Sequence, residues 1–221
     1  MMRVMTLMSL GEMNSCSEKI KLQDMPELTF DDPTHTYRLN GIVIPSVTTV
    51  MEPLSAEKYR GISDSTLDNA ANKGTEVHNA IENWIKFGIV DISPEFKGYL
   101  DGFLEWWNLR KPIVIGSEIR AYHKVLMYGG TLDLLCIIDG KLNLIDFKST
   151  SVLSDMLCGV QLEGYSQALA SHGIKVDKKR ILHLKKDGKW SDPEYPASDP
   201  LRWRVFGSLK CVYDYIQSSP K

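Results

Sequence analysis

The chain has 221 residues, of which 43% are hydrophobic and 24% are charged, and its formal net charge is −2. This composition is that of an ordinary globular protein, long enough for one sizeable domain. The small net charge excludes a global basic field, and the sequence holds no apolar run of membrane-spanning length. The four cysteines are far apart and form no C-x-x-C pair, which argues against a zinc or iron–sulfur site and fits a reducing compartment.

The first half of the chain is predicted to begin with a disordered segment, residues 1–24. Short strands are expected over 28–44, where Asn40-Gly41 favours a type I′ turn. Ser46 is expected to cap a short helix. Two helices follow over 64–87 and 94–109, and we interpret the region of about 64–110 as an N-terminal helical elaboration that forms an arch or lid.

The second half alternates strands and helices. Strands are predicted over 113–122, 132–138, 142–147 and 179–186, and helices over 154–172 and 199–216. The Asp139-Gly140 dipeptide joins the second and third strands as a tight hairpin. Residues 25–221 are therefore expected to form one α/β domain, with a central mixed β-sheet flanked by helices and its core at about 113–190.

Charged residues interrupt the two strands of this hairpin, which otherwise read as buried. Asp146 and Lys148 are two apart, so they leave the same face of their strand, and Asp133 is on the partner strand. Buried charges are costly unless they are paired or bind a metal. The oxygen ligands suit Mg²⁺ or Mn²⁺, the ions of phosphate-ester chemistry. A structural salt bridge is the alternative.

Other polar residues fall where they could face the same point. His78 lies on or beside the apolar stripe of the helix over 64–87, and Glu118 is the one acid of its strand. Gln161 and Tyr165 are four apart, hence neighbours on one helix face. Each also has a structural interpretation: a satisfied histidine, the wet face of a strand, or a polar helix flank.

Seven basic residues lie between positions 175 and 189. Among them Lys179, Arg180, Lys185 and Lys186 are the candidates for contacts with a nucleic-acid backbone. Solvated lysines that protect an edge strand from aggregation are the alternative.

Five short motifs occur in order along the chain. They are Gly74-Thr75-Glu76-Val77-His78, Glu118, Gly130-Thr131-Leu132-Asp133, Asp146-Phe147-Lys148-Ser149 and Gln161-x-x-x-Tyr165. The set resembles the PD-(D/E)XK nuclease superfamily, and within it the RecB-type exonuclease branch. The segment Pro45-Ser46-Val47-Thr48 is similar to one in phage exonucleases and in the mitochondrial genome-maintenance exonuclease. Leu132 stands where the named motif has proline.

The resemblance implies a role for each motif residue. Asp133, Asp146, the backbone carbonyl of Phe147, and His78 would bind one or two Mg²⁺ or Mn²⁺ ions, with Glu118 as a further ligand. Lys148 would position the attacking water or help to deprotonate it. Gln161 and Tyr165 would support the site and the strand being cut. The chain lacks the cysteine set of iron–sulfur relatives and has no P-loop, so neither a cluster nor a nucleotide cofactor is expected.

The expected function is that of a metal-dependent DNA exonuclease with a restriction-endonuclease-like core. It would hydrolyse DNA from a free end, prefer single strands, and serve recombination, repair or replication, with any helicase or recombination partner as a separate protein and no membrane involved. The cytoplasm of a bacterial or phage-infected cell is the expected location, in preference to the mitochondrial matrix. A structure- or site-specific endonuclease and a catalytically silent DNA-binding module are the alternatives. Polarity, oligomeric state and pathway stay open.

Overall fold

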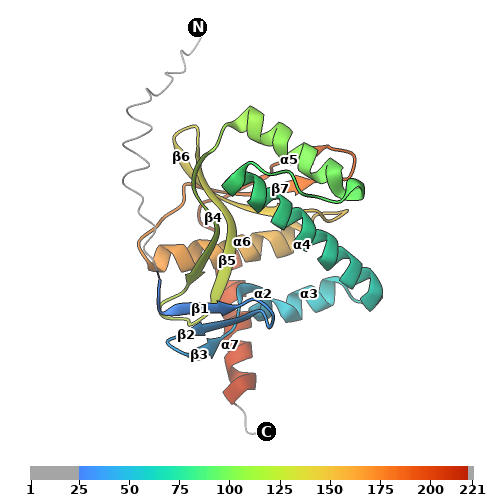
Figure 1. Ribbon diagram of the computed structural model, residues 1–221. Coiled ribbons are helices and arrows are strands. Elements are labelled where there is room, and N and C mark those ends of the chain that lie inside the picture. The colour runs from blue at the N-terminus through green and yellow to red at the C-terminus, as the bar shows by residue number, and fades with distance from the viewer. Residues whose placement is uncertain (1–24, 219–221) are drawn as a thin grey trace.

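A six-stranded mixed β-sheet forms the centre of the computed structural model, which describes residues 25–218 (Figure 1). Helices cover both faces of this sheet, so the predicted α/β class is confirmed. The expectation of disorder for 1–24 lies outside the described residues. No helix within residues 25–218 is both long and apolar enough to cross a membrane.

The sheet has the strand order β4-β5-β6-β7-β8, and β9 also pairs with β7. Its strands are β4 (Ile113–Tyr122), β5 (Gly129–Ile138), β6 (Lys141–Lys148), β7 (Lys178–Leu184), β8 (Trp190–Ser191) and β9 (Glu194–Tyr195). Asp139 and Gly140 both have positive φ, 51° and 70°, and turn β5 into the antiparallel β6 as predicted. By contrast β6 and β7 are parallel, and α6 (Asp155–Ser171) makes the crossover between them.

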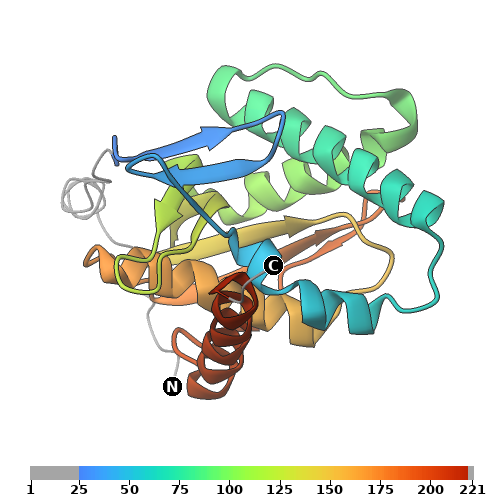
Figure 2. The ribbon, with the colours of Figure 1, turned by 90° about the horizontal axis from the view of Figure 1, so that it is seen from below.

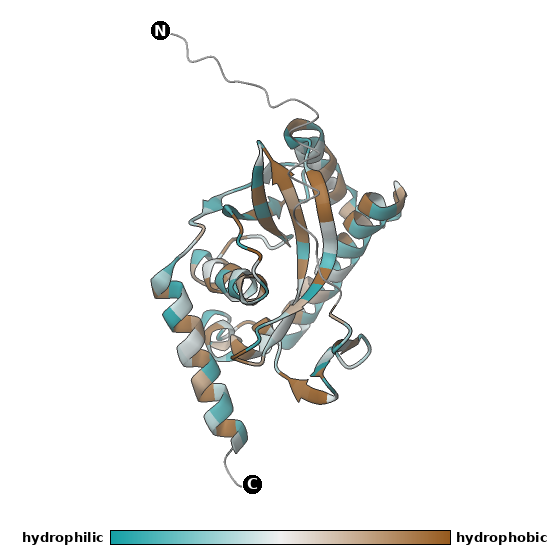
Figure 3. Cartoon of the chain, turned by 90° about the vertical axis from the view of Figure 1, so that its left-hand side faces the viewer, coloured by the Kyte–Doolittle hydropathy of each residue, from teal (hydrophilic) through white to brown (hydrophobic). Residues whose placement is uncertain are grey.

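Each face of the sheet has its own hydrophobic core. One core joins β5 and β6 to α6, to α7 (Pro200–Ser218) and to the short α2 (Val47–Val50). The other joins the opposite face to α4 (Asp64–Phe87), η1 (Pro94–Phe96) and α5 (Lys97–Arg110). Figure 2 shows the sheet between these two helical layers. Figure 3 shows that the strands of the central sheet are largely hydrophobic.

A small three-stranded sheet lies beside the outer end of β4 and β5. It consists of β1 (Leu28–Asp31), β2 (Thr36–Leu39) and β3 (Ile42–Ile44), and α3 (Glu52–Lys58) follows α2 further along the chain. The predicted turn at Asn40-Gly41 has φ angles of 49° and 82°, and Ser46 caps α2 by accepting a bond from the Thr49 amide. An isolated bridge between Ser46 and Gly129 ties this segment to the start of β5.

The region interpreted as an arch or lid divides into two parts. Val77 and Ile81 of α4, with Leu100 and Phe103 of α5, are buried against the sheet and belong to its core. Residues 64–72, the first part of α4, are all exposed. A lid function is therefore a prediction only for that first part of α4.

Candidate metal centre

The strands β5 and β6 separate at the point where the predicted acids lie. Their ladder ends at the pair Leu134–Ile145. Two residues beyond Ile145, the Phe147 amide donates to Asp133 Oδ2 at 2.6 Å, so a side chain takes the place of a backbone partner. This substitution satisfies a buried N–H and at the same time opens the sheet beside Asp133 and Asp146.

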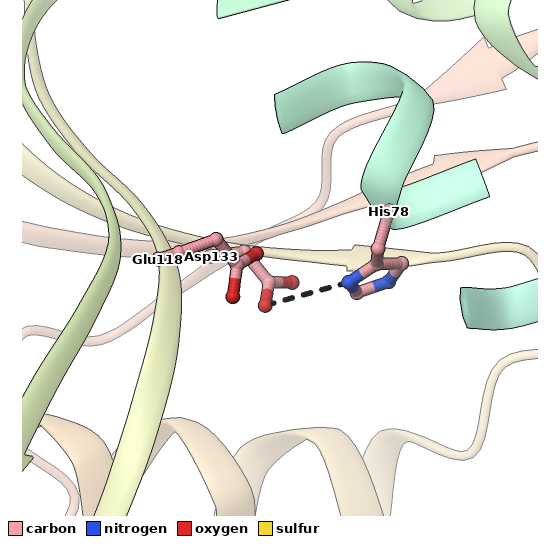
Figure 4. Close-up of side chains that lie close together, drawn as sticks. All are labelled: His78, Glu118 and Asp133. Atoms are coloured by element: carbon pink, nitrogen blue, oxygen red, sulfur yellow. Dashed lines mark ion pairs between the residues drawn. The ribbon is translucent and has the colours of Figure 1, made fainter. Parts of the chain in front are cut away.

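His78 reaches this opening from α4 (Figure 4). Its Nε2 lies 3.0 Å from the Phe147 carbonyl oxygen, and its Nδ1 lies 3.6 Å from Asp133 Oδ1. A neutral imidazole has one N–H, so it can donate to only one of these two acceptors. The other ring nitrogen then faces an oxygen with no proton between them. A proton on Asp133, whose pKa is raised by burial, or a bound cation would resolve this arrangement.

Glu118 completes a group of three ligands. One ligand atom each from His78, Glu118 and Asp133 lies within 4.8 Å of the others. Glu118 has a φ of 50°, rare for a residue other than glycine, and β4 shifts its register with β5 just before it, between Val114 and Gly116. Such a conformation costs about 1–3 kcal/mol. The sequence left open whether Glu118 faces Asp133, and the structure shows that it does.

The electrostatics of this group favour a cation. Burial raises the pKa of Glu118 to about 8, and the carboxylates of Asp133 and Glu82 add to the effect. Burial likewise raises the pKa of Asp133, although His78 and Lys148 oppose the shift. Raised pKa values mean that the ionised carboxylates are unfavourable here, and a bound divalent ion would stabilise their ionised form. Two carboxylates, one imidazole and the nearby Phe147 carbonyl make a donor set that fits Mg²⁺ or Mn²⁺.

Asp146 and Lys148 form an ion pair beside the three ligands. Lys148 Nζ lies 2.6 Å from Asp146 Oδ2, and the Asp146 side chain is only 3% exposed. Burial alone would lower the pKa of Lys148, but Asp146 and Asp133 hold it above its ordinary value. The structure therefore contains the salt bridge that the sequence offered as the alternative, and it places this pair next to the candidate ligands.

Gln161 and Tyr165 approach from α6, on the other side of the sheet opening. Gln161 Nε2 donates to Tyr165 Oη at 3.2 Å. Burial raises the pKa of Tyr165 well above its ordinary value, and the charges of Asp146 and Asp133 raise it further. A Cβ atom at Gly130 would lie 2.6 Å from Tyr165 Cε1, so only glycine leaves room for the ring. The Gly130 of the motif thus has a steric role.

Tyr37 contacts the strand that carries Asp133, and the sequence alone did not identify it. Its hydroxyl lies 2.7 Å from Thr131 Oγ1, two residues before Asp133, and the side chain is buried. This bond joins β2 of the small sheet to β5 of the central sheet across 94 residues. No local pattern predicts such a contact. The signal nearest to it was the Gly129-Gly130 pair, since the Tyr37 ring lies 3.2 Å from where a Gly129 Cβ would be.

Two of the four predicted backbone-binding cations are placed elsewhere. Lys179 is 1% exposed and pairs with Glu163, a fully buried residue of α6. Arg180 is engaged by Asp192, Glu194 and Asn143. Neither is available to a nucleic acid, so that part of the prediction is wrong, because β7 is an interior strand whose cations need internal partners. Lys185 and Lys186 follow the strand and are exposed.

Comparisons with known proteins give limited likeness. No family model and no curated protein matches the chain. An alkaline exonuclease (LHK-Exo) from Laribacter hongkongensis is similar with a TM-score of 0.40 and 12% identity, over 78% of this chain and 90% of that one. Its complex with dAMP gives a TM-score of 0.42 and 11% identity, over 77% of this chain and 85% of that one.

A third solved structure, SSO0001, is similar with a TM-score of 0.37 and 19% identity, over 55% of this chain. The match spans 59% of the length of SSO0001, less than two thirds of it. At such low similarity, the functional interpretation depends on the geometry of the candidate metal centre.

Proposed function

We propose that this chain is a divalent-metal-dependent deoxyribonuclease that hydrolyses phosphodiester bonds. The observation that supports this best is the group His78, Glu118 and Asp133, with ligand atoms within 4.8 Å of one another, beside the Asp146–Lys148 ion pair. Acidic ligands with an adjacent ammonium suit a reaction in which negative charge grows on a phosphate. We assign the chain to the PD-(D/E)XK superfamily and its RecB-type branch as part of this proposal.

The protein groups divide the work as follows. Asp133, Glu118, His78 and the Phe147 carbonyl would hold Mg²⁺ or Mn²⁺, with Asp146 beside them. When bound, such an ion lowers the pKa of a ligated water and offsets charge on the phosphate.

The residues around these ligands would act on the water and the phosphate. Because the pKa of Lys148 is raised, its side chain is an ammonium at neutral pH. Lys148 would therefore donate hydrogen bonds to the water or the phosphate. The hydroxyl of Tyr165 stays protonated for the same reason and, oriented by Gln161, can donate to the strand being cut.

The finer parts of the proposal concern the substrate. We propose that the enzyme acts from a free end and prefers single-stranded DNA, with the exposed first part of α4 as a lid over the metal centre. A role in recombination, repair or replication, in the cytoplasm of a bacterial or phage-infected cell, belongs to the same proposal. An endonuclease with the same metal centre is the second candidate.

Digestion of end-labelled DNA tests the proposal. Linear single strands, linear duplexes and closed circles are incubated with Mg²⁺ or Mn²⁺ and with wild type, Asp146→Asn or Lys148→Ala. We expect the wild type to degrade linear DNA only, and both variants to lose nearly all cleavage while still binding DNA. The control is Asp139→Asn, an equivalent change in the exposed turn of the same hairpin, where asparagine tolerates the positive φ.

Each contrary result has a distinct meaning. Cleavage of circular DNA as readily as of linear DNA would show that the enzyme is an endonuclease and not an exonuclease. Full activity in either purified variant would remove the metal centre from the mechanism. Binding without cleavage by the wild type would leave a silent DNA-binding module.

A further inference from the structure

Three lysines from separate segments gather at the edge of the sheet where the metal centre lies. Lys185 and Lys186 directly follow β7, and Lys73 is on α4, five residues before His78. Because β6 and β7 are parallel, their carboxyl ends lie at the same edge of the sheet. In the register of the two strands, Lys148 lies opposite His183. Lys185 is thus two residues, about 7 Å along the chain, from the residue opposite Lys148. We call Lys73, Lys185 and Lys186 the lysine edge.

Close backbone packing fixes the position of the lysine edge. A Cβ atom at Gly98 of α5 would overlap the Lys186 carbonyl, and one at Gly102 would lie 2.8 Å from the Gly188 oxygen. The turn after β7 therefore rests on α5 with no side chain between them. Lys73 reaches the same helix, with Nζ 5.5 Å from the centre of the Tyr99 ring. Contacts with α5 therefore fix the backbone of the turn that carries Lys185 and Lys186, and they place the side chain of Lys73 on the same helix.

No lysine of the lysine edge forms an ion pair within the part of the chain that the structure describes. Lys178, Arg180 and Lys189, which are close in sequence, each form an ion pair with an acid. Lys73, Lys185 and Lys186 form none within residues 25–218, and burial and the charge of Lys186 both lower the pKa of Lys73. Like charges held together without a partner are unfavourable in the free protein, and a bound polyanion would relieve them.

We infer that the lysine edge binds the phosphodiester backbone of the DNA strand that occupies the metal centre, at phosphates beyond the one being cut. Lysine acts on phosphate as a point charge and carries no base specificity, which suits an enzyme that degrades DNA of any sequence. The inference rests on the proposed nuclease function. It places the backbone contacts on α4 and on the turn after β7, and not along β7 itself.

The salt dependence of binding tests the inference. The affinity for a single-stranded oligonucleotide is measured in the Asp146→Asn background over a series of salt concentrations. The test variant carries Lys73→Gln, Lys185→Gln and Lys186→Gln. The control variant carries Lys111→Gln, Lys141→Gln and Lys175→Gln, three exposed lysines at the opposite end of the sheet. Thermal unfolding of both proteins checks that they are folded.

Each lost phosphate contact on a single strand should reduce the slope of log K against log salt by about 0.7, so three contacts predict a fall of about 2. We expect this fall, with affinity at least ten-fold weaker, in the test variant only. An unchanged slope, or equal losses in both variants, would overturn the lysine edge. If the wild type still cleaves DNA in the digestion assay, that failure leaves the nuclease function intact. Absence of both binding and cleavage would overturn both.

Discussion

Glu118 should make the metal-free protein less stable as the pH rises. Its pKa is about 8 in the folded protein, against an ordinary value of 4.5. Between these values the folded protein keeps a proton that the unfolded chain has released, so the free energy of unfolding falls as pH increases. Below about 4.5 and above about 8 the contribution of Glu118 no longer changes. The substitution Glu118→Gln removes this titration and keeps the shape of the side chain.

The size of the effect follows from one proton. The free energy of unfolding changes by about 1.4 kcal/mol per pH unit, hence by about 2.7 kcal/mol from about pH 5.5 to 7.5. In a protein of this length that is about 5–11 °C in Tm. The lowered pKa values of His123 and His172 act in the opposite direction, since they favour the folded state at higher pH. Asp133 also has a raised pKa and acts in the same direction as Glu118. Asp133 and the two histidines titrate in both proteins, so the difference between wild type and variant reports Glu118 together with its electrostatic coupling to Asp133.

The assay is thermal unfolding of both proteins in EDTA at half-unit steps of pH. We expect the Tm of the wild type to fall relative to that of Glu118→Gln as pH rises from 5 to 8. Saturating Mg²⁺ should flatten the wild-type curve, and at 100 times its Kd it should add about 2.7 kcal/mol. A constant difference in Tm across the whole range, without metal, would refute the electrostatic account of Glu118.

Other substitutions test single contacts. Gly130→Ala places a Cβ 2.6 Å from Tyr165 Cε1. The overpacking should lower the free energy of unfolding, measured in urea, by about 1–3 kcal/mol. The variant should also lose activity. Gly74→Ala, where a Cβ meets nothing within 4 Å, should instead stabilise α4 by about 1 kcal/mol; a loss of stability there would contradict the open geometry. Lys179→Met leaves Glu163 buried without its partner and should cost about 3–5 kcal/mol, yet leave the salt slope of DNA binding unchanged.

The parts of the fold governed by local chemistry were predictable. The hairpin of β5 and β6 follows from two apolar, partly β-branched runs and from Asp139-Gly140, whose φ angles the turn requires. The boundaries of α4 coincide with the predicted 64–87, since Ser63 caps its start and Gly88 ends it with a φ of 67°. The sequence predicts that Asp133 and Asp146 share a site, because buried charges are costly unless they are paired or bind a metal.

Contacts between distant segments were not predictable. Lys179 looked like a surface cation because its partner, Glu163, belongs to a different element, and only the packing of α6 on β7 brings the two together. The Tyr37–Thr131 bond has the same character. Lys73 was not singled out either, since its relation to Lys186 depends on how α4 and the β7–β8 turn both pack against α5. Sequence periodicity gives the face of an element and leaves its partner undetermined.

Three departures from ordinary folding rules coincide at the candidate metal centre. The β5–β6 ladder ends early, Glu118 adopts a positive φ, and burial raises the pKa values of Glu118 and Asp133. Each costs stability, and none is needed by the hydrophobic cores, which are continuous on both faces. Strain and unfavourable charge at one point are expected where the structure is adapted to a ligand. A divalent cation would offset the two negative charges of ionised Glu118 and Asp133, so these features support the proposed metal-dependent function.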